Sequence, residues 1–159
     1  MFRAVLDANV YISAAIRPEG ATGQIIERFQ RESAFELVVS PAIVDEVLRG
    51  LRYSKVTKYM RSEIEPDSWF TGIVLLADLV AGDHLLSGVS DDPNDDKYLA
   101  AAVEGRATRL VTGDPDLLRV GTHAGVRIVN PCAFLTPLAS HVDRDSGELE
   151  LVTRCYPGA

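Results

Sequence analysis

Short apolar runs alternate with segments of helical periodicity along most of this chain. The apolar runs cover residues 2–6, 35–40, 77–82, 108–114 and 126–130, and the helical segments cover 21–33, 40–51, 55–64, 67–77 and 91–105. Strands that are separated by helices favour a mostly parallel sheet with helices on both of its faces. The pattern therefore predicts an α/β fold built around a sheet of about five strands.

The length of the chain, 159 residues, fits one domain with a substantial core. The sequence becomes more polar from Thr136 onward. We therefore expect residues 1–135 to form the domain, and residues 136–159 to form a C-terminal extension that packs on it or trails from it.

The formal net charge of −7 argues against broad, nonspecific attraction to nucleic acid, because such binding depends on Lys and Arg. It does not exclude an enzyme that acts on nucleic acid, since a bound cation offsets the charge of a carboxylate site. No apolar run approaches the ~20 residues that cross a bilayer, and no signal-peptide pattern is visible. Together with two widely separated cysteines, Cys132 and Cys155, these features predict a cytoplasmic protein without membrane association.

Acidic residues stand where a parallel sheet presents its ligand-binding edge. Asp7 closes the first apolar run and Asp114 closes the fourth, so both belong at the carboxyl edge of the sheet. Glu46 lies in the second turn of the helix after the second strand, and Asp95 and Asp96 begin the helix before the fourth. Each acid alone is also explained as a helix cap or a solvated charge, but together they can point into one crevice.

A cluster of carboxylates is unstable by itself, because the like charges repel one another and raise the pKa of one or more of them. A hard divalent cation removes this repulsion, and Mg²⁺ is typically held by a few carboxylates, waters and substrate phosphate oxygens. Such ions serve phosphodiester cleavage in many enzymes. The acidic edge therefore predicts a site for Mg²⁺ or Mn²⁺.

Four segments resemble the motifs of PIN domains, in the order that the family has them. "VLDANVYISA" resembles the first strand, which ends in Asp followed by a small residue and Asn. "SPAIVDEVLRGL" resembles the second motif, and "SDDPNDDKYLAAAVEG" with "RLVTGDPDLL" resembles the third and fourth motifs of the toxin-like subgroup. The resemblance covers residues 2–135 and implies a three-layer α/β/α fold.

The resemblance also implies a metal-dependent endoribonuclease that cleaves RNA with a metal-activated water, commonly as the VapC-like toxin of a toxin–antitoxin pair. On this basis Asp7, Glu46, Asp95 and Asp114 are the catalytic metal ligands, with Mg²⁺ or Mn²⁺ as cofactor. Asp95 is preferred to Asp96 because its spacing to "TGD" fits the subgroup without a gap. A cognate antitoxin protein and a homodimer are the partners that the family implies.

Further residues are interpreted as supporting ones. Asn9 and Thr112 are expected to orient carboxylates or waters by hydrogen bonds, although a turn and an ordinary strand end explain them equally well. Asp92 and Asp116 are additional acids beside the site, and Asp96 and Asp116 are the alternative metal ligands.

Basic residues recur every three positions after the second motif, at Arg49, Arg52, Lys55, Lys58 and Arg61. This row predicts contacts with RNA phosphates, with Tyr53 or Tyr59 stacking on a base. A solvated helix face is the alternative, and the sequence does not separate RNA binding from contacts with a protein partner.

Two other functions stay open on the sequence. A non-catalytic PIN-like module would bind RNA or a protein without cutting. A haloacid-dehalogenase-like phosphatase also has an Asp after its first strand and a later "GD" motif, but it needs an acid where this chain has Asn9. Because every PIN motif keeps its acid, the nuclease is the favoured hypothesis.

Overall fold

The computed structural model describes residues 1–84 and 92–142 of the chain. These residues contain a six-stranded sheet in the order β3-β2-β1-β4-β6-β5. Its strands are β1 (Phe2–Leu6), β2 (Phe35–Val39), β3 (Asp78–Leu79), β4 (Arg109–Val111), β5 (Thr122–His123) and β6 (Val126–Val129). Neighbouring strands are parallel except β5 and β6, so the expected α/β fold with a mostly parallel sheet is confirmed.

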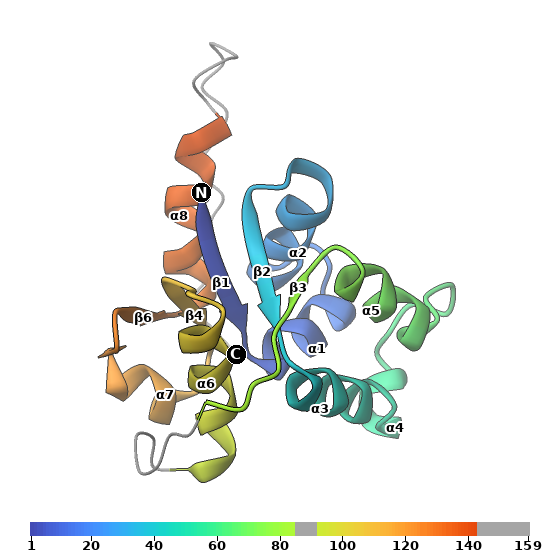
Figure 1. Ribbon diagram of the computed structural model, residues 1–159. Coiled ribbons are helices and arrows are strands. Elements are labelled where there is room, and N and C mark those ends of the chain that lie inside the picture. The colour runs from blue at the N-terminus through green and yellow to red at the C-terminus, as the bar shows by residue number, and fades with distance from the viewer. Residues whose placement is uncertain (85–91, 143–159) are drawn as a thin grey trace.

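Helices cover both faces of this sheet (Figure 1). They are α1 (Ala8–Ile16), α2 (Ala21–Glu32), α3 (Pro41–Leu51), α4 (Ser54–Thr57), α5 (Pro66–Val74), α6 (Asp96–Glu104), α7 (Pro115–Val120) and α8 (Pro131–Val142), with a 3₁₀ turn, η1 (Pro93–Asp95). Helix α2 contacts both α1 and α8, whereas α6 packs against β1, β2, β4 and β6. The three-layer α/β/α arrangement that the motifs implied is therefore present.

The central strand β1 explains the apolar run that follows Arg3 near the start of the sequence. Its residues Ala4, Val5 and Leu6 are 0% exposed, because helices cover both faces of the strand. The sheet grows from β1 through β2 on one side and through β4 on the other. The carboxyl ends of β1 and β4 therefore border the switch point of the sheet, which is where such folds bind ligands.

Helix α3 begins as the sequence predicts. The Ser40 hydroxyl accepts a hydrogen bond from the Ile43 N–H at 3.4 Å, and Pro41 occupies the first helical position. Ile43, Val47 and Leu51 are buried along one face. Glu46 lies partly buried at the edge of this face, and Arg49, the first of the basic residues, is exposed.

Several boundaries differ from the sequence prediction. The helix expected over 55–64 is only α4, Ser54–Thr57, and it has no buried residue, so packing does not extend it. The helix expected over 67–77 is α5, Pro66–Val74. The sequence pattern also misses the short edge strand β5 and the whole of α1, α7 and α8. Helix α1 is apolar around most of its circumference, which hides its period: its buried residues are Ala8, Val10, Tyr11, Ala14 and Ala15.

Helix α8 runs across the expected boundary between residues 135 and 136. The part of the expected extension after Val142, including Cys155, lies outside the described residues. In the part of the chain that the structure describes, no helix is long and apolar enough to cross a membrane.

Candidate active site

Asp7 lies at the switch point of the sheet, between the end of β1 and the start of α1. Its carboxylate is 4% exposed and accepts two hydrogen bonds, from the backbone N–H of Asn9 at 3.1 Å and from the Thr112 hydroxyl at 2.7 Å. The first bond caps α1, and the second joins β1 to the end of β4. These donors stabilise a charge that would be costly to bury without partners. The side chain of Asn9 itself is exposed.

Thr112 connects Asp7 to a second acid. Its buried hydroxyl donates to Asp7 Oδ2 and accepts the backbone N–H of Asp114 at 3.0 Å. Asp114 then caps α7 by accepting the Asp116 N–H at 2.9 Å. The carboxylate of Asp116 forms an ion pair with Arg119 on the same helix, so a cation already balances its charge.

Glu46 reaches the site from α3 and is held by two neighbours on α6. The Tyr98 hydroxyl donates to Glu46 Oε2 at 2.5 Å, and Lys97 Nζ lies 2.5 Å from the same oxygen. The Tyr98 oxygen also accepts the backbone N–H of Ala8 at 3.3 Å. Burial, followed by the negative charge of Asp7, raises the pKa of Tyr98, so this phenol remains a donor at neutral pH.

Asp95 is the acid with the most perturbed titration. Burial raises its pKa to about 6, and the negative charges of Asp114, Asp92, Asp7 and Glu46 add to the shift. Its Oδ2 atom is buried and has no hydrogen-bond partner among the described residues. The structure therefore brings Asp7, Glu46, Asp95 and Asp114 into one electrostatic field. Asp96, one position later, begins α6.

These acids suit a divalent cation in charge and in donor chemistry. A buried, unpaired carboxylate oxygen is the kind of atom that an ion or a water satisfies. In residues 1–84 and 92–142, however, no group of three or more acidic, histidine or cysteine side chains already has the spacing of a complete metal site. A hydrated Mg²⁺ ion needs only one or two direct carboxylate ligands, because it keeps several waters. The residues therefore fit a hydrated ion better than a fully enclosed one.

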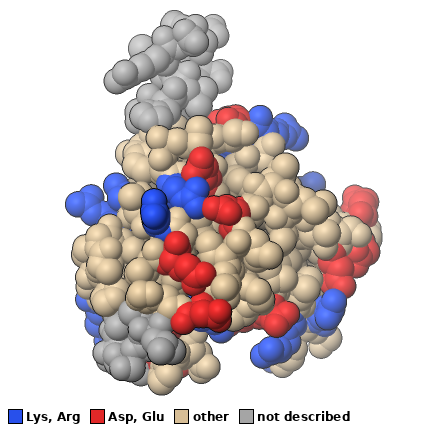
Figure 2. All heavy atoms as spheres, in the orientation of Figure 1, with Lys and Arg blue, Asp and Glu red and all other residues tan. Residues whose placement is uncertain are grey.

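Acidic side chains are also prominent on the surface. Figure 2 shows a band of Asp and Glu side chains down the middle of one face, with Lys and Arg beside its upper part and toward the edges. A face with this charge attracts cations and repels polyanions. A polyanionic substrate would therefore need basic contacts or bound cations to approach it.

The basic row is divided by the end of α3. Arg49 lies in the last turn of α3, and Lys55 lies in α4. Arg52 forms an ion pair with Asp67, at 2.7 Å between Nη2 and Oδ2, so it is less available to a phosphate than the sequence suggested. Lys58 Nζ lies 5.9 Å from the centre of the Tyr59 ring. A shallow pocket of about 380 Å³ beside this region is lined by Asp45, Leu48, Arg49, Arg52 and Tyr53.

Sequence reasoning missed Lys97 and Tyr98, which hold Glu46. Their position in the sequence could have indicated them, since they directly follow Asp95 and Asp96 at the start of the same helix. A tyrosine on the buried face of a helix is ordinarily a core residue, and its hydroxyl partner is decided only by tertiary packing.

The pKa of Asp95 leads to a prediction about stability in the metal-free protein. Because the pKa in the folded state lies above the ordinary value of 3.8 for an aspartate, the folded protein holds this proton more tightly than the unfolded chain does, and stability falls as the pH rises from about 4 to about 6. The side chain of Asp95→Asn does not titrate, so this variant does not lose stability in this way. We expect the variant to be more stable than the wild type by about 1–2 kcal/mol at pH 7, after allowance for solvent screening, and to lose this advantage below pH 4.

Urea unfolding of both proteins at a series of pH values, with EDTA present, measures this difference. Asp45→Asn, which changes an exposed acid on α3, is the matched control for the loss of one negative charge. A difference between Asp95→Asn and wild type that stays constant from pH 3.5 to pH 7 would contradict the prediction.

A second prediction concerns Tyr98. Tyr98→Phe removes the donor to Glu46 and leaves the Ala8 N–H without its acceptor, so we expect a loss of about 1–3 kcal/mol in stability. It should also weaken Mn²⁺ binding by about 10–100-fold, as removal of a group that orients a metal ligand typically does. Chemical unfolding and a Mn²⁺ titration measure the two effects. The exposed Tyr59→Phe is the control, and unchanged Mn²⁺ affinity in Tyr98→Phe would refute a role in holding Glu46.

The fold and the site define an α/β/α domain whose acidic residues gather at the switch point of a parallel sheet. The PIN-domain family model matches residues 3–116, and the chain belongs to this family. The resemblance seen in its four motifs is thereby confirmed. PIN domains are generally nucleases, which favours the nuclease hypothesis over the phosphatase alternative.

Individual proteins are similar to this chain as well. The uncharacterized protein MJ1680 of Methanocaldococcus jannaschii is 29% identical over 116 residues, which are 73% of each chain. A chain in the crystal structure of VapBC2 from Rickettsia felis, bound to a DNA fragment from their promoter, superimposes with a TM-score of 0.53 and 13% identity. The match covers 80% of this chain and 98% of that one. At such low identity this likeness shows the fold alone.

Proposed function

We propose that this protein is a Mg²⁺- or Mn²⁺-dependent endoribonuclease that cuts RNA phosphodiester bonds. The observation that carries the proposal is the buried, unpaired oxygen of Asp95, which lies in the negative field of Asp7, Glu46 and Asp114. Such an arrangement is costly without a cation and favourable with one. Membership of a family of nucleases supports the same conclusion.

Each side chain has a separate role in the proposed site. Asp7, Asp95 and Asp114 would hold the ion, and Glu46 would complete the site from α3. A bound Mg²⁺ or Mn²⁺ would supply an activated water and stabilise the charge on the leaving oxygen. Thr112 fixes the distance between Asp7 and the Asp114 backbone through its shared hydroxyl. Tyr98 and Lys97 keep Glu46 directed toward the site before the ion arrives.

The substrate would reach this acidic site through basic and aromatic contacts on α3 and α4. Arg49 lines the shallow pocket there, and Lys55 and Lys58 form no ion pair within the part of the chain that the structure describes. Tyr53 and Tyr59 are 59% and 65% exposed, so bases can stack on them. These residues favour single-stranded RNA, or exposed loops, as the substrate class.

We further propose that the protein acts in the cytoplasm as the toxin of a toxin–antitoxin pair and forms a homodimer. The motif resemblance to the toxin-like subgroup supports the first part. Exposed leucines at the end of α5 and on the edge strand β3 support the second, since Leu75, Leu76 and Leu79 are 79%, 60% and 59% exposed. Sedimentation measures the oligomeric state, and a monomer at all concentrations would contradict the dimer.

Cleavage of a labelled panel of single-stranded RNA, structured RNA and single-stranded DNA tests the activity. We expect cutting of RNA with Mn²⁺ or Mg²⁺, none with EDTA, and none by Asp114→Asn. Asp45→Asn, which removes the same charge from the surface of α3, should cut normally. In cells, induction of the wild type but not of Asp114→Asn should arrest growth if the protein is a toxin.

A non-catalytic binding module is the second candidate, and the contacts of Glu46 favour it. Lys97 already neutralises Glu46, and the described residues do not form a ready-made metal site. Binding of RNA without cleavage under every metal condition, and without any effect of Asp114→Asn, would select this candidate over the nuclease.

A further inference from the structure

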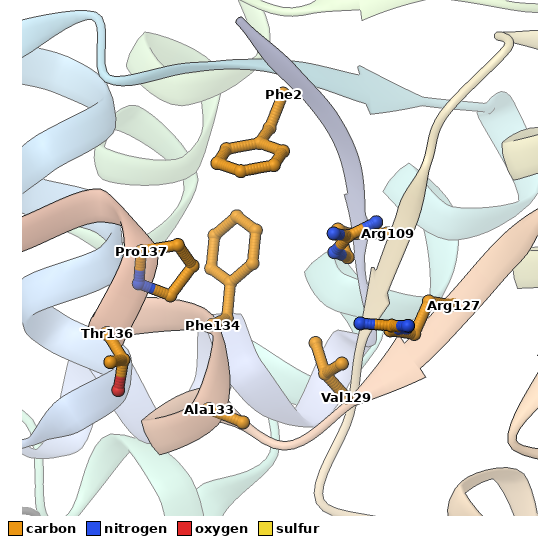
Figure 3. A pocket seen from close by; sticks show the side chains of 8 residues that line it. All are labelled: Phe2, Arg109, Arg127, Val129, Ala133, Phe134, Thr136 and Pro137. Atoms are coloured by element: carbon orange, nitrogen blue, oxygen red, sulfur yellow. The ribbon is translucent and has the colours of Figure 1, made fainter. Parts of the chain in front are cut away.

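A second pocket lies apart from the acidic site, between α8 and the strands β4 and β6 (Figure 3). Its volume is about 470 Å³, within the range of pockets that hold small molecules. Arg109, which lines it, begins β4, whereas Asp114 follows the opposite end of the same strand. The pocket is therefore not part of the proposed nuclease site.

Two arginines provide the charge of this pocket. Arg109 and Arg127 are register partners on the parallel strands β4 and β6, so their side chains leave the same face of the sheet. Figure 3 shows both guanidinium groups on one side of the pocket. Arg109 is held in place, since its Nη1 donates to the Thr108 carbonyl at 3.0 Å and its guanidinium lies 5.2 Å from the centre of the Phe2 ring.

No carboxylate of the described residues forms an ion pair with either arginine, although the chain carries a net charge of −7. Five other arginines do have acidic partners: Arg3, Arg28, Arg31, Arg52 and Arg119. Neighbouring like charges on one face of a sheet destabilise it. A carboxylate or phosphate between the two guanidinium groups would remove that repulsion and accept several charge-assisted hydrogen bonds.

Apart from Thr136, the other residues that line the pocket are apolar. Phe134 is 1% exposed and is fixed by an edge-to-face contact with Phe35, with ring centres 5.1 Å apart. Val129 and Ala133 complete this side of the wall. A bare inorganic anion would leave the half-buried Phe2, Val129 and Pro137 in contact with water, whereas an attached ring would cover them.

We propose that this pocket binds a small organic anion. Its carboxylate or phosphate contacts Arg109 and Arg127, and its flat apolar ring packs against Val129 and Pro137. This ligand class is independent of the proposed nuclease function, because the two sites share no residue.

Calorimetric titration of the full chain with phenyl phosphate tests the proposal, with inorganic phosphate and phenol as the two halves of the probe. Phenyl phosphate should bind about tenfold or more tightly than either half, and Arg127→Gln should weaken it by about tenfold or more. Arg61→Gln, which removes an exposed charge elsewhere, should leave binding unchanged. Arg127 is exposed, so its variant should fold, and its metal-dependent cleavage of RNA should equal that of the wild type.

Two further probes distinguish the sources of such a ligand. Tighter binding of phenylacetate than of AMP would indicate an aromatic carboxylate, and the reverse would indicate a nucleotide. Either outcome supports a site for an anionic group with an attached ring, provided that Arg127→Gln abolishes binding of the preferred probe. Equal affinity of phenyl phosphate for wild type and Arg127→Gln, or binding no tighter than that of inorganic phosphate, would overturn the proposal.

Discussion

RNA cleavage by Asp7→Asn is expected to fall by about a thousandfold or more, while the fold remains intact. The loss follows from the role of a metal ion, which is worth several kcal/mol of transition-state stabilisation. The fold survives because an asparagine oxygen can still accept the Asn9 N–H and cap α1. The unfolding free energy of the metal-free variant should therefore lie within about 1 kcal/mol of the wild-type value.

Three measurements check this expectation: the cleavage rate with Mn²⁺, the affinity for Mn²⁺, and the melting temperature in EDTA. Asp45→Asn is the control for loss of one negative charge, and it should retain cleavage. Wild-type activity in Asp7→Asn would remove Asp7 from the site. Loss of activity with a large drop in melting temperature would instead assign Asp7 a structural role alone.

Thr112→Val should produce the largest loss of stability among single substitutions at the site. The substitution keeps the shape of the side chain but removes the hydroxyl that donates to Asp7 and accepts from the Asp114 N–H. Because Thr112 is fully buried, water does not replace either bond. We expect a loss of about 2–4 kcal/mol, and a fall of about 5–15 °C in melting temperature.

Thr108→Val is the matched control, since its hydroxyl is exposed and makes only a long contact of 3.5 Å with the Arg3 carbonyl. Its stability should change by less than about 0.5 kcal/mol. The double variant Thr112→Val/Asp7→Asn should lose less stability than the sum of the two single losses. The reason is that the Thr112 hydroxyl no longer has a charged acceptor once Asp7 is replaced by asparagine. Full additivity of the two substitutions would contradict a direct contribution of this hydrogen bond.

The strands and the acids that follow them could be predicted from local sequence. A strand that is buried on both faces is mostly apolar, and β1 and β2 are apolar except at Arg3 and Glu36. Parallel strands place their carboxyl ends at one edge, so Asp7 and Asp114 could be assigned to a common rim before any coordinates existed. The start of α3 was equally visible, because Ser40 and Pro41 carry a local capping signal.

Other elements were not visible because their signal is not local. Helix α1 has only a narrow polar stripe, Asn9 and Ser13, so its period does not separate it clearly from a buried strand. The segment after Thr57 has helical periodicity in sequence, but without an apolar face to pack it does not continue α4. The two-residue strand β5 is defined only by its antiparallel pairing with β6.

The sequence by itself determined the fold class, the family and the acids that gather at the switch point. Only the tertiary structure decided what each acid contacts. It joins Asp7 to the end of β4 through Thr112 and places Lys97 and Tyr98 on Glu46. It also leaves one Asp95 oxygen buried, with no hydrogen-bond partner in the part of the chain that the structure describes. The physical reason is range: strand burial and helix capping depend on neighbours in sequence, whereas hydrogen bonds and desolvation depend on residues brought together by packing.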